Sequence, residues 1–99
     1  MPTSSYKYET VAASQTGQVL GATGAAGDRI KKIIVTVTTA ATSTVALLDG
    51  STSVSLVPAV TPVGIYTIDF GEEGILSTTG AWSLTTGAGC NLIAVGDFT

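Results

Sequence analysis

The side chains of this sequence that could carry chemistry are seven carboxylates and one thiol. The sequence contains no histidine, which excludes imidazole acid–base catalysis, histidine-based nucleophilic triads and histidine metal sites. Carboxylates alone can hydrolyse glycosides, but that reaction needs two of them across a cleft, and no spacing here pairs them. We therefore expect no enzymatic activity, no metal and no cofactor. The seven carboxylates and the thiol belong to Glu9, Asp28, Asp49, Asp69, Glu72, Glu73, Asp97 and Cys90.

Three short segments resemble ligand-binding loops. The segment "DFGEEG" (69–74) could offer oxygen atoms to calcium but lacks the spacing of a known calcium loop, so a solvated turn is the preferred interpretation. The segments "GATGAAG" (21–27) and "GAGC" (87–90) resemble phosphate-binding glycines. A dinucleotide fingerprint needs a strand before and a helix after, and a P-loop needs a Lys-Ser/Thr pair. We expect both to be ordinary loops.

Cys90 and Trp82 each have a structural and a functional interpretation. A single cysteine cannot form an internal disulfide, and the small and apolar neighbours of Cys90 favour a buried thiol. Trp82 could be a stacking platform for a sugar, but a lone tryptophan in a small β protein is more often its largest core side chain. We predict that both residues belong to the core.

The composition indicates a surface suited to association. Only 11% of the residues are charged, against about 25% in an average soluble domain, and Ser and Thr are abundant. The net charge of −3 disfavours nucleic-acid binding, which needs clustered basic side chains. Arg29, Lys31 and Lys32 form one small basic cluster, which either discourages pairing at a strand edge or docks an acidic partner. No apolar run approaches the ~18 residues of a membrane span, and the N-terminus has no signal-peptide pattern.

Patterns typical of β-strands recur along the chain. In "KKIIVTVTTAATSTVALLDG" (31–50), Ile33, Val35 and Val37 alternate with Ile34, Thr36 and Thr38, which predicts a hairpin with one apolar face and one threonine-rich face. In "TSVSLVP" Val54 and Leu56 share one face, and in "GIYTIDFG" Ile65 and Thr67 lie on the face opposite the aromatic residues. "CNLIAVGDF" is apolar on both faces, so this strand is either central between two layers or covered at a subunit contact. We predict an all-β fold, a β-sandwich or jelly-roll-like barrel of about seven to eight strands. The predicted core is Ile33, Val35, Val37, Tyr66, Ile68, Phe70, Trp82 and Leu84.

The first sixteen residues are polar and small, so we separate an N-terminal arm (1–16) from the β-sandwich domain (17–99). On an extended strand, Tyr6 and Tyr8 would share one side and Lys7 the other. The arm either adds a strand to a neighbouring subunit or is the first strand of the domain's own sheet. The candidate partner interface is Tyr6, Lys7, Tyr8, Arg29, Lys31 and Lys32.

The segments "AGDRIKKIIVTVTTAATSTVALLDGS", "VTPVGIYTIDFG" and "GAWSLTTGAGCNLIAVG" resemble small β-sandwich proteins of tailed-bacteriophage virions. The resemblance covers about residues 25–99. It implies a virion protein, made in the host cytoplasm, that decorates and stabilises the outside of a capsid and brings no catalytic motif. It also implies assembly on a symmetric particle, commonly as trimers, with the major capsid protein or another virion protein as partner. The alternative is a head, neck or tail fibre module that adheres to a host or to carbohydrate.

Overall fold

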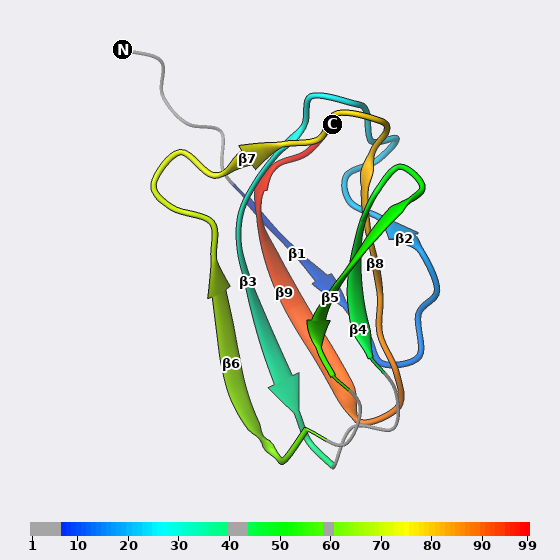
Figure 1. Ribbon diagram of the computed structural model, residues 1–99, viewed down its shortest axis with the longest axis vertical. Helices are drawn as coiled ribbons and strands as arrows, with labels where there is room; N and C mark the ends of the chain where they lie inside the picture. Colours follow the sequence, from blue (N-terminus) through cyan, green and yellow to red (C-terminus); the bar gives the residue numbers. More distant parts are fainter. Residues whose placement is uncertain (1–6, 40–43, 59–60) are drawn as a thin grey trace.

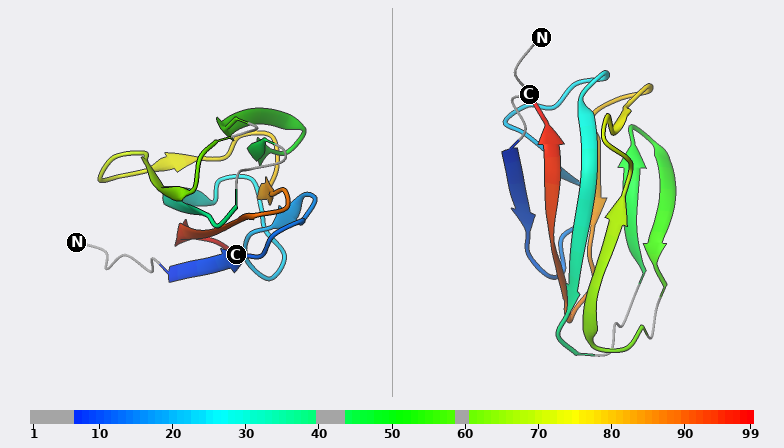
Figure 2. Two further views of the ribbon diagram at one scale, coloured as in Figure 1. Left: turned by 90° about the horizontal axis from the view of Figure 1, so that it is seen from below. Right: turned by 90° about the vertical axis from the view of Figure 1, so that its left-hand side faces the viewer.

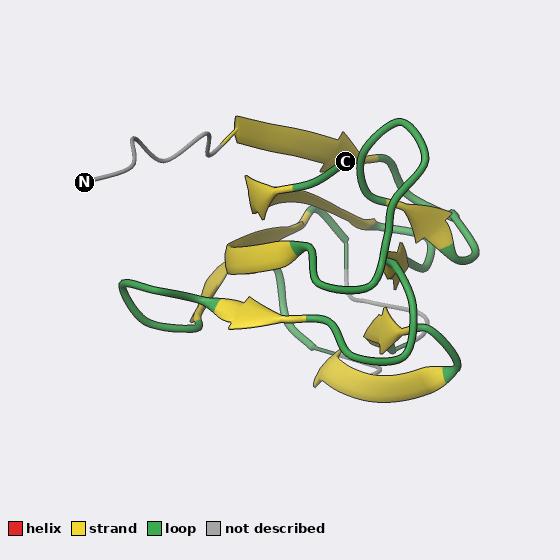
Figure 3. Cartoon of the chain, turned by 90° about the horizontal axis from the view of Figure 1, so that it is seen from above, coloured by secondary structure: helices red, strands yellow, loops and turns green. Residues whose placement is uncertain are grey.

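The computed structural model describes residues 7–39, 44–58 and 61–99, and these residues form nine strands and no helix (Figures 1 and 3). The predicted all-β class is confirmed. Two of the nine strands have only two residues. One of them was expected from the sequence as a short strand around residues 18–20. The strands are β1 (Lys7–Val11), β2 (Gln18–Val19), β3 (Arg29–Val37), β4 (Val45–Asp49), β5 (Thr52–Val57), β6 (Gly64–Asp69), β7 (Ile75–Leu76), β8 (Trp82–Thr85) and β9 (Cys90–Asp97).

The strands form two antiparallel sheets packed as a β-sandwich. The five-stranded sheet has the order β1-β9-β3-β6, and β7 pairs with the start of β3. The four-stranded sheet has the order β2-β8-β4-β5. Figure 2 (left) views the molecule along its length and shows the two sheets side by side. In the part of the chain that the structure describes, there is no helix long and apolar enough to cross a membrane.

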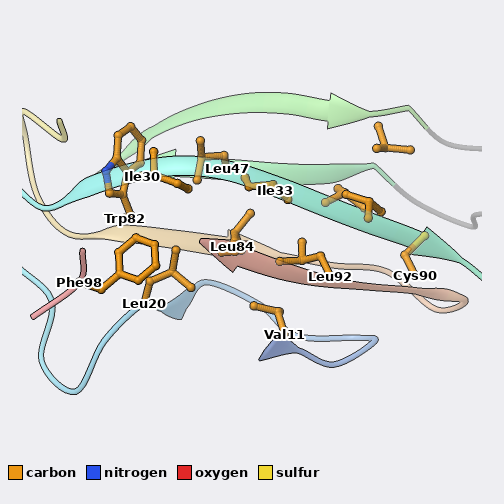
Figure 4. Close-up of a cluster of buried hydrophobic side chains, with 14 of the residues drawn as sticks. Val11, Leu20, Ile30, Ile33, Leu47, Trp82, Leu84, Cys90, Leu92 and Phe98 are labelled. Atoms are coloured by element: carbon orange, nitrogen blue, oxygen red, sulfur yellow. The ribbon is translucent and has the colours of Figure 1, made fainter. Parts of the chain in front are cut away.

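The core lies between the inner faces of the two sheets (Figure 4). The prediction is confirmed for Ile33, Val35, Val37, Trp82 and Leu84, which are all buried. For the three residues of β3, Ile33, Val35 and Val37, burial follows from alternation, since each buried residue is followed by one on the opposite face. The other buried hydrophobic residues are Val11, Leu20, Ile30, Val45, Leu47, Val57, Cys90, Leu92, Ala94 and Phe98.

Tyr66, Ile68 and Phe70 were expected in the core, but they are only partly buried. Their side chains do point to the inner face, as the alternation predicted. Their partial exposure has a topological cause, because among the described strands β6 is the last one of its sheet and no strand pairs with its other side. Alternation indicates which face a side chain is on, but it does not distinguish a central strand from an edge strand.

A β-bulge changes the inner face of β5. Val45 pairs with Val57 and Ala46 pairs with Ser55, so Leu56 is an extra residue between the two pairs. The sequence pattern placed Val54 and Leu56 together on one face. In the structure Val54 lies opposite Leu47 and Val57 takes the buried position instead of Leu56.

The described part of the predicted arm begins with β1, which pairs with β9 of the same chain from Lys7–Gly96 to Val11–Leu92. Val11 is fully buried. Of the two placements considered for the arm, residues 7–11 therefore adopt the second, a strand of the domain's own sheet. Tyr6 lies outside the described residues. The Glu9 carboxylate fixes this edge by accepting the N–H of Gly21 at 2.7 Å and a Gln18 side-chain N–H at 3.2 Å.

Candidate interaction surface

The outer face of the five-stranded sheet, which we call the outer face A, is formed by the residues that alternate with the core. Strand register places them in four rows that cross the sheet. Because residues directly opposite each other in an antiparallel pair share a face, each row is a set of neighbours. The rows are Leu76–Arg29–Asp97, Tyr8–Val95–Lys32–Asp69, Thr10–Ile93–Ile34–Thr67 and Asn91–Thr36–Ile65.

Outer face A exposes large apolar side chains. Tyr8 is 69% exposed, Ile65 is 70% exposed and Ile93 is 37% exposed. The charged members of the four rows are at one end of the face, where Lys32 pairs with Asp69 and Arg29 pairs with Asp97 across the strands. The rest of the face consists of aliphatic, aromatic, threonine and asparagine side chains, and a shallow depression beside it is lined by Thr10, Ala12, Asn91 and Ile93. Little charge must be dehydrated to cover such a surface.

The outer face of the four-stranded sheet has a different character. Its rows are Val19–Ser83–Leu48–Ser53 and Thr85–Ala46–Ser55. Among these described residues, Val19 is the one exposed large hydrophobic side chain. The two outer faces therefore differ in apolar content, which makes outer face A the stronger candidate for contact with another protein.

The structure brings together some of the residues predicted to form the interface. Tyr8 and Lys32 lie in one row of outer face A, with Val95 between them. Lys7 pairs with Gly96 and, by alternation, is on the opposite face from Tyr8. The Arg29 guanidinium donates to the carbonyl oxygen of Glu73 and so holds the turn that precedes β7.

Lys31 is the extra residue of a second β-bulge, between Ile30 and Lys32, and its carbonyl oxygen accepts the N–H of Phe70 at 2.9 Å. Sequence reasoning did not include Ile65, Ile93 and Val95 in the interface. The signal that could have found two of them was the apolar character of "CNLIAVGDF" on both faces, since a central strand with two apolar faces must have something covering its second face.

Three of the carboxylates hold loops in place. Asp49 accepts the N–H groups of Thr78 and Thr79, each at 3.0 Å, and the Thr78 hydroxyl at 2.8 Å. Desolvation raises the pKa of Asp49, but the hydrogen bonds from Thr79 and Thr78 together outweigh it, so the pKa of this carboxyl lies below its usual value. The other two carboxylates are Glu9, which holds the β1 edge, and Asp28.

Asp28 is buried and binds the last residue of the chain. Its carboxylate accepts the N–H of Ala25 at 3.1 Å and the N–H of Thr99 at 3.0 Å. The Asp28 carbonyl oxygen accepts the indole N–H of Trp82 at 2.8 Å. Trp82 is therefore a core residue with a satisfied polar atom, as predicted, and its ring is not a platform for a sugar.

The remaining candidate loops also have structural roles. In the glycine-rich segment 21–27, the N–H groups of Thr23 and Gly24 donate to the Thr99 carbonyl oxygen at 3.1 and 3.4 Å. Gly21 has φ +91°, and a Cβ there would lie 2.8 Å from the Thr99 carbonyl carbon, so a glycine is required. Asp69 accepts the N–H of Gly71 at 2.8 Å and forms a local turn. Burial raises the pKa of the Cys90 thiol.

Among the described residues, no three His, Cys, Asp or Glu side chains lie close enough to hold a metal ion. No protein-family model, curated protein or solved structure matches this chain. Outer face A and the sequence segments that resemble virion proteins are therefore the features that bear on function.

Proposed function

We propose that this protein is a non-enzymatic component of a tailed-phage virion that binds the outside of the capsid through outer face A and stabilises it. The observation that carries the proposal is the exposure of Tyr8, Ile65 and Ile93 on one continuous sheet face whose charged pairs, Lys32–Asp69 and Arg29–Asp97, are at one end. The resemblance of residues 25–99 to small virion proteins supplies the class of partner.

The energetics of outer face A favour a protein partner. Removing a large apolar side chain from water contributes about 1.5–3 kcal/mol when burial is complete. A regular sheet face is held by the ladders on both sides of β3 and β9 and loses little conformational freedom on binding. Threonine hydroxyls on the same face can donate or accept hydrogen bonds to a protein surface.

The alternative, a fibre module that adheres to carbohydrate, has less support. A carbohydrate site needs exposed aromatic rings in a groove, and the Trp82 side chain is buried between the sheets. Tyr8 is an exposed ring, but its neighbour in the row is Val95, an aliphatic side chain. We therefore favour the capsid as the partner.

Co-sedimentation with purified capsids of the phage or prophage that encodes the chain tests the proposal. We expect saturable binding by the wild-type protein and binding at least ~10-fold weaker for Ile93→Lys, since a charge would be buried at the contact. Ser55→Lys is the matched control, because Ser55 is exposed on the outer face of the other sheet, and it should bind as the wild type does. Circular dichroism and melting would confirm that both variants fold.

Absence of wild-type binding, or equal binding by wild type and Ile93→Lys, would refute this assignment. Binding to a host glycan that Ile93→Lys leaves intact would instead favour the fibre alternative.

A further inference from the structure

The two long sides of the sandwich differ in how they are closed. On the side of β1 and β2, Val11 and Leu20 are fully buried and Glu9 fixes the edge through Gly21 and Gln18. On the side of β6 and β5, inward-facing apolar side chains remain in contact with solvent. Val54 is 52% exposed, and Leu56, Tyr66, Ile68 and Phe70 are only partly buried. Within residues 7–39, 44–58 and 61–99, nothing covers this side of the core completely.

The backbone of β6 is available on this open side. β6 is the terminal strand of its sheet (Figure 1). The N–H of Phe70 donates to Lys31, and antiparallel alternation then directs the backbone groups of Ile68, Tyr66 and Gly64 to β3 as well. By the same alternation, the N–H and C=O groups of Ile65, Thr67 and Asp69 point away from the sheet.

Among the described residues, this edge has few of the features that usually block strand pairing, and its one charged side chain, Asp69, is at the C-terminal end of β6. The sequence of β6, "GIYTID", contains no lysine, arginine or proline, and its pairing with β3 has a continuous register without a bulge. The opposite edge differs, since a Gln18 side-chain N–H donates to the Thr10 carbonyl of β1. An extended strand is thus the ligand for which the β6 edge is suited.

We propose that the occupant of this edge is a second copy of the chain, with the two β6 strands paired antiparallel about a two-fold axis at Thr67. In that register, Thr67 of one copy lies opposite Thr67 of the other, and Ile65 lies opposite Asp69. All three outward-pointing residues of each strand then exchange hydrogen bonds. The two five-stranded sheets become one continuous sheet, and outer face A continues across both copies.

The side chains of β6 are complementary to themselves in this register. On the inner face, Tyr66 of one copy lies opposite Ile68 of the other, an aromatic and β-branched pair of the kind that stabilises antiparallel sheets. Phe70 lies opposite Gly64 of the second copy, so its ring can cover a residue that has no side chain. The half-buried side chains of the open edge therefore gain partners from the same strand.

The charge distribution favours the antiparallel pairing of two copies. Asp69, Glu72 and Glu73 are at the C-terminal end of β6, whereas the segment "TPV" (61–63) before it is uncharged. Antiparallel pairing places the acidic end of each copy beside the uncharged end of the other. A parallel arrangement would bring the acidic ends together. The two-fold dimer differs from the trimer that the family resemblance implies, and one measurement separates them.

Sedimentation equilibrium of the isolated chain tests the assembly without any capsid. We expect the wild type to approach twice the 9.9 kDa monomer mass as its concentration rises. Thr67→Pro removes an N–H that points away from β3, so the variant should fold and remain a monomer. A wild-type monomer at millimolar concentration, a trimer, or a dimer that Thr67→Pro leaves intact would overturn the proposal.

A cross-link tests the register and does not depend on the folding of the proline variant. Paired residues that exchange hydrogen bonds have Cα atoms ~5.5 Å apart, within the range that a disulfide spans. Thr67→Cys should therefore form a covalent dimer under mild oxidation, since the native Cys90 is buried. Thr10→Cys, exposed on the same face in β1, is the control and should remain largely monomeric. Failure of Thr67→Cys to cross-link faster than Thr10→Cys would exclude this register.

Discussion

At the scale of single residues, this protein uses its few charges as structural ligands. Asp49 lies at the end of β4 and accepts hydrogen bonds from Thr78 and Thr79, which lie in the loop that leads to β8. The Asp28 carboxylate likewise accepts the N–H of Thr99. A carboxylate that accepts several N–H groups can hold a loop that has no strand pairing of its own. The few carboxylates of this chain are therefore enough to hold several of its loops in place.

Substitution of Asp49 should change the pH dependence of stability. Because the folded-state pKa is lowered, the stabilisation is present above the unfolded-state pKa and is lost as the pH falls through the folded-state pKa. We expect Asp49→Asn to melt below the wild type at pH 7, with the difference shrinking as the pH falls below ~4. Thermal melts followed by circular dichroism measure this, with Glu72→Gln, in an exposed turn, as the control. A difference that stays constant from neutral to acid pH would show that the carboxylate charge is not responsible.

At the scale of elements, strand β1 completes the closed side of the sandwich. It pairs with β9 along its whole length, and Glu9 connects it to the loop after β2. Because β1 forms part of the sheet, truncation should affect stability and not only assembly.

Two truncations test the role of β1. Deletion of residues 1–9 should melt lower than deletion of residues 1–6, because the two differ by Lys7–Glu9 and hence by the Glu9 hydrogen bonds. A hydrogen bond to a charged group contributes about 1.5–3 kcal/mol, and each kcal/mol shifts the melting temperature of a domain of this size by roughly 4–8 °C. Equal melting temperatures would mean that these residues contribute nothing to the fold.

At the scale of strands, prediction from the sequence was accurate where apolar and polar residues alternate over many positions. The strand containing Ile33, Val35 and Val37 was predicted with the correct faces, and the outward position of Ile65 and Thr67 followed from the same pattern. Burial of Leu20 and Phe98 could not be predicted, because these residues lie beyond the strands and are brought to the core by loops. The bulge at Leu56 was also missed, since one inserted residue changes the face of every later residue.

The candidate surface was only partly predictable, because residues that are neighbours on it are distant along the chain. The threonine-rich face of β3 was visible in the sequence, but its neighbours Ile93 and Ile65 are distant along the chain. Only the strand order β9-β3-β6 places them side by side. The basic cluster of Arg29, Lys31 and Lys32 was compact in sequence, yet a bulge and the Arg29–Glu73 contact give its members different surroundings.

At the scale of the whole molecule, the sandwich is asymmetric in two directions. One outer face exposes several large apolar side chains, whereas the other is composed largely of small hydroxyl residues, and one long side is closed while the other exposes β6. These two asymmetries suit a molecule that contacts a larger assembly through its face and a second copy through its edge. Both contacts involve the same five-stranded sheet, so a dimer through β6 would present two copies of outer face A in one plane.

Electron cryomicroscopy of capsids saturated with the protein tests the central claim most directly, at a resolution that separates the two sheets. We predict density in which the five-stranded sheet lies against the shell, with Tyr8, Ile93 and Ile65 at the contact, and the four-stranded sheet faces outward. Density with the four-stranded sheet or a loop end against the shell would contradict the account. So would capsids that carry no density for the protein at all.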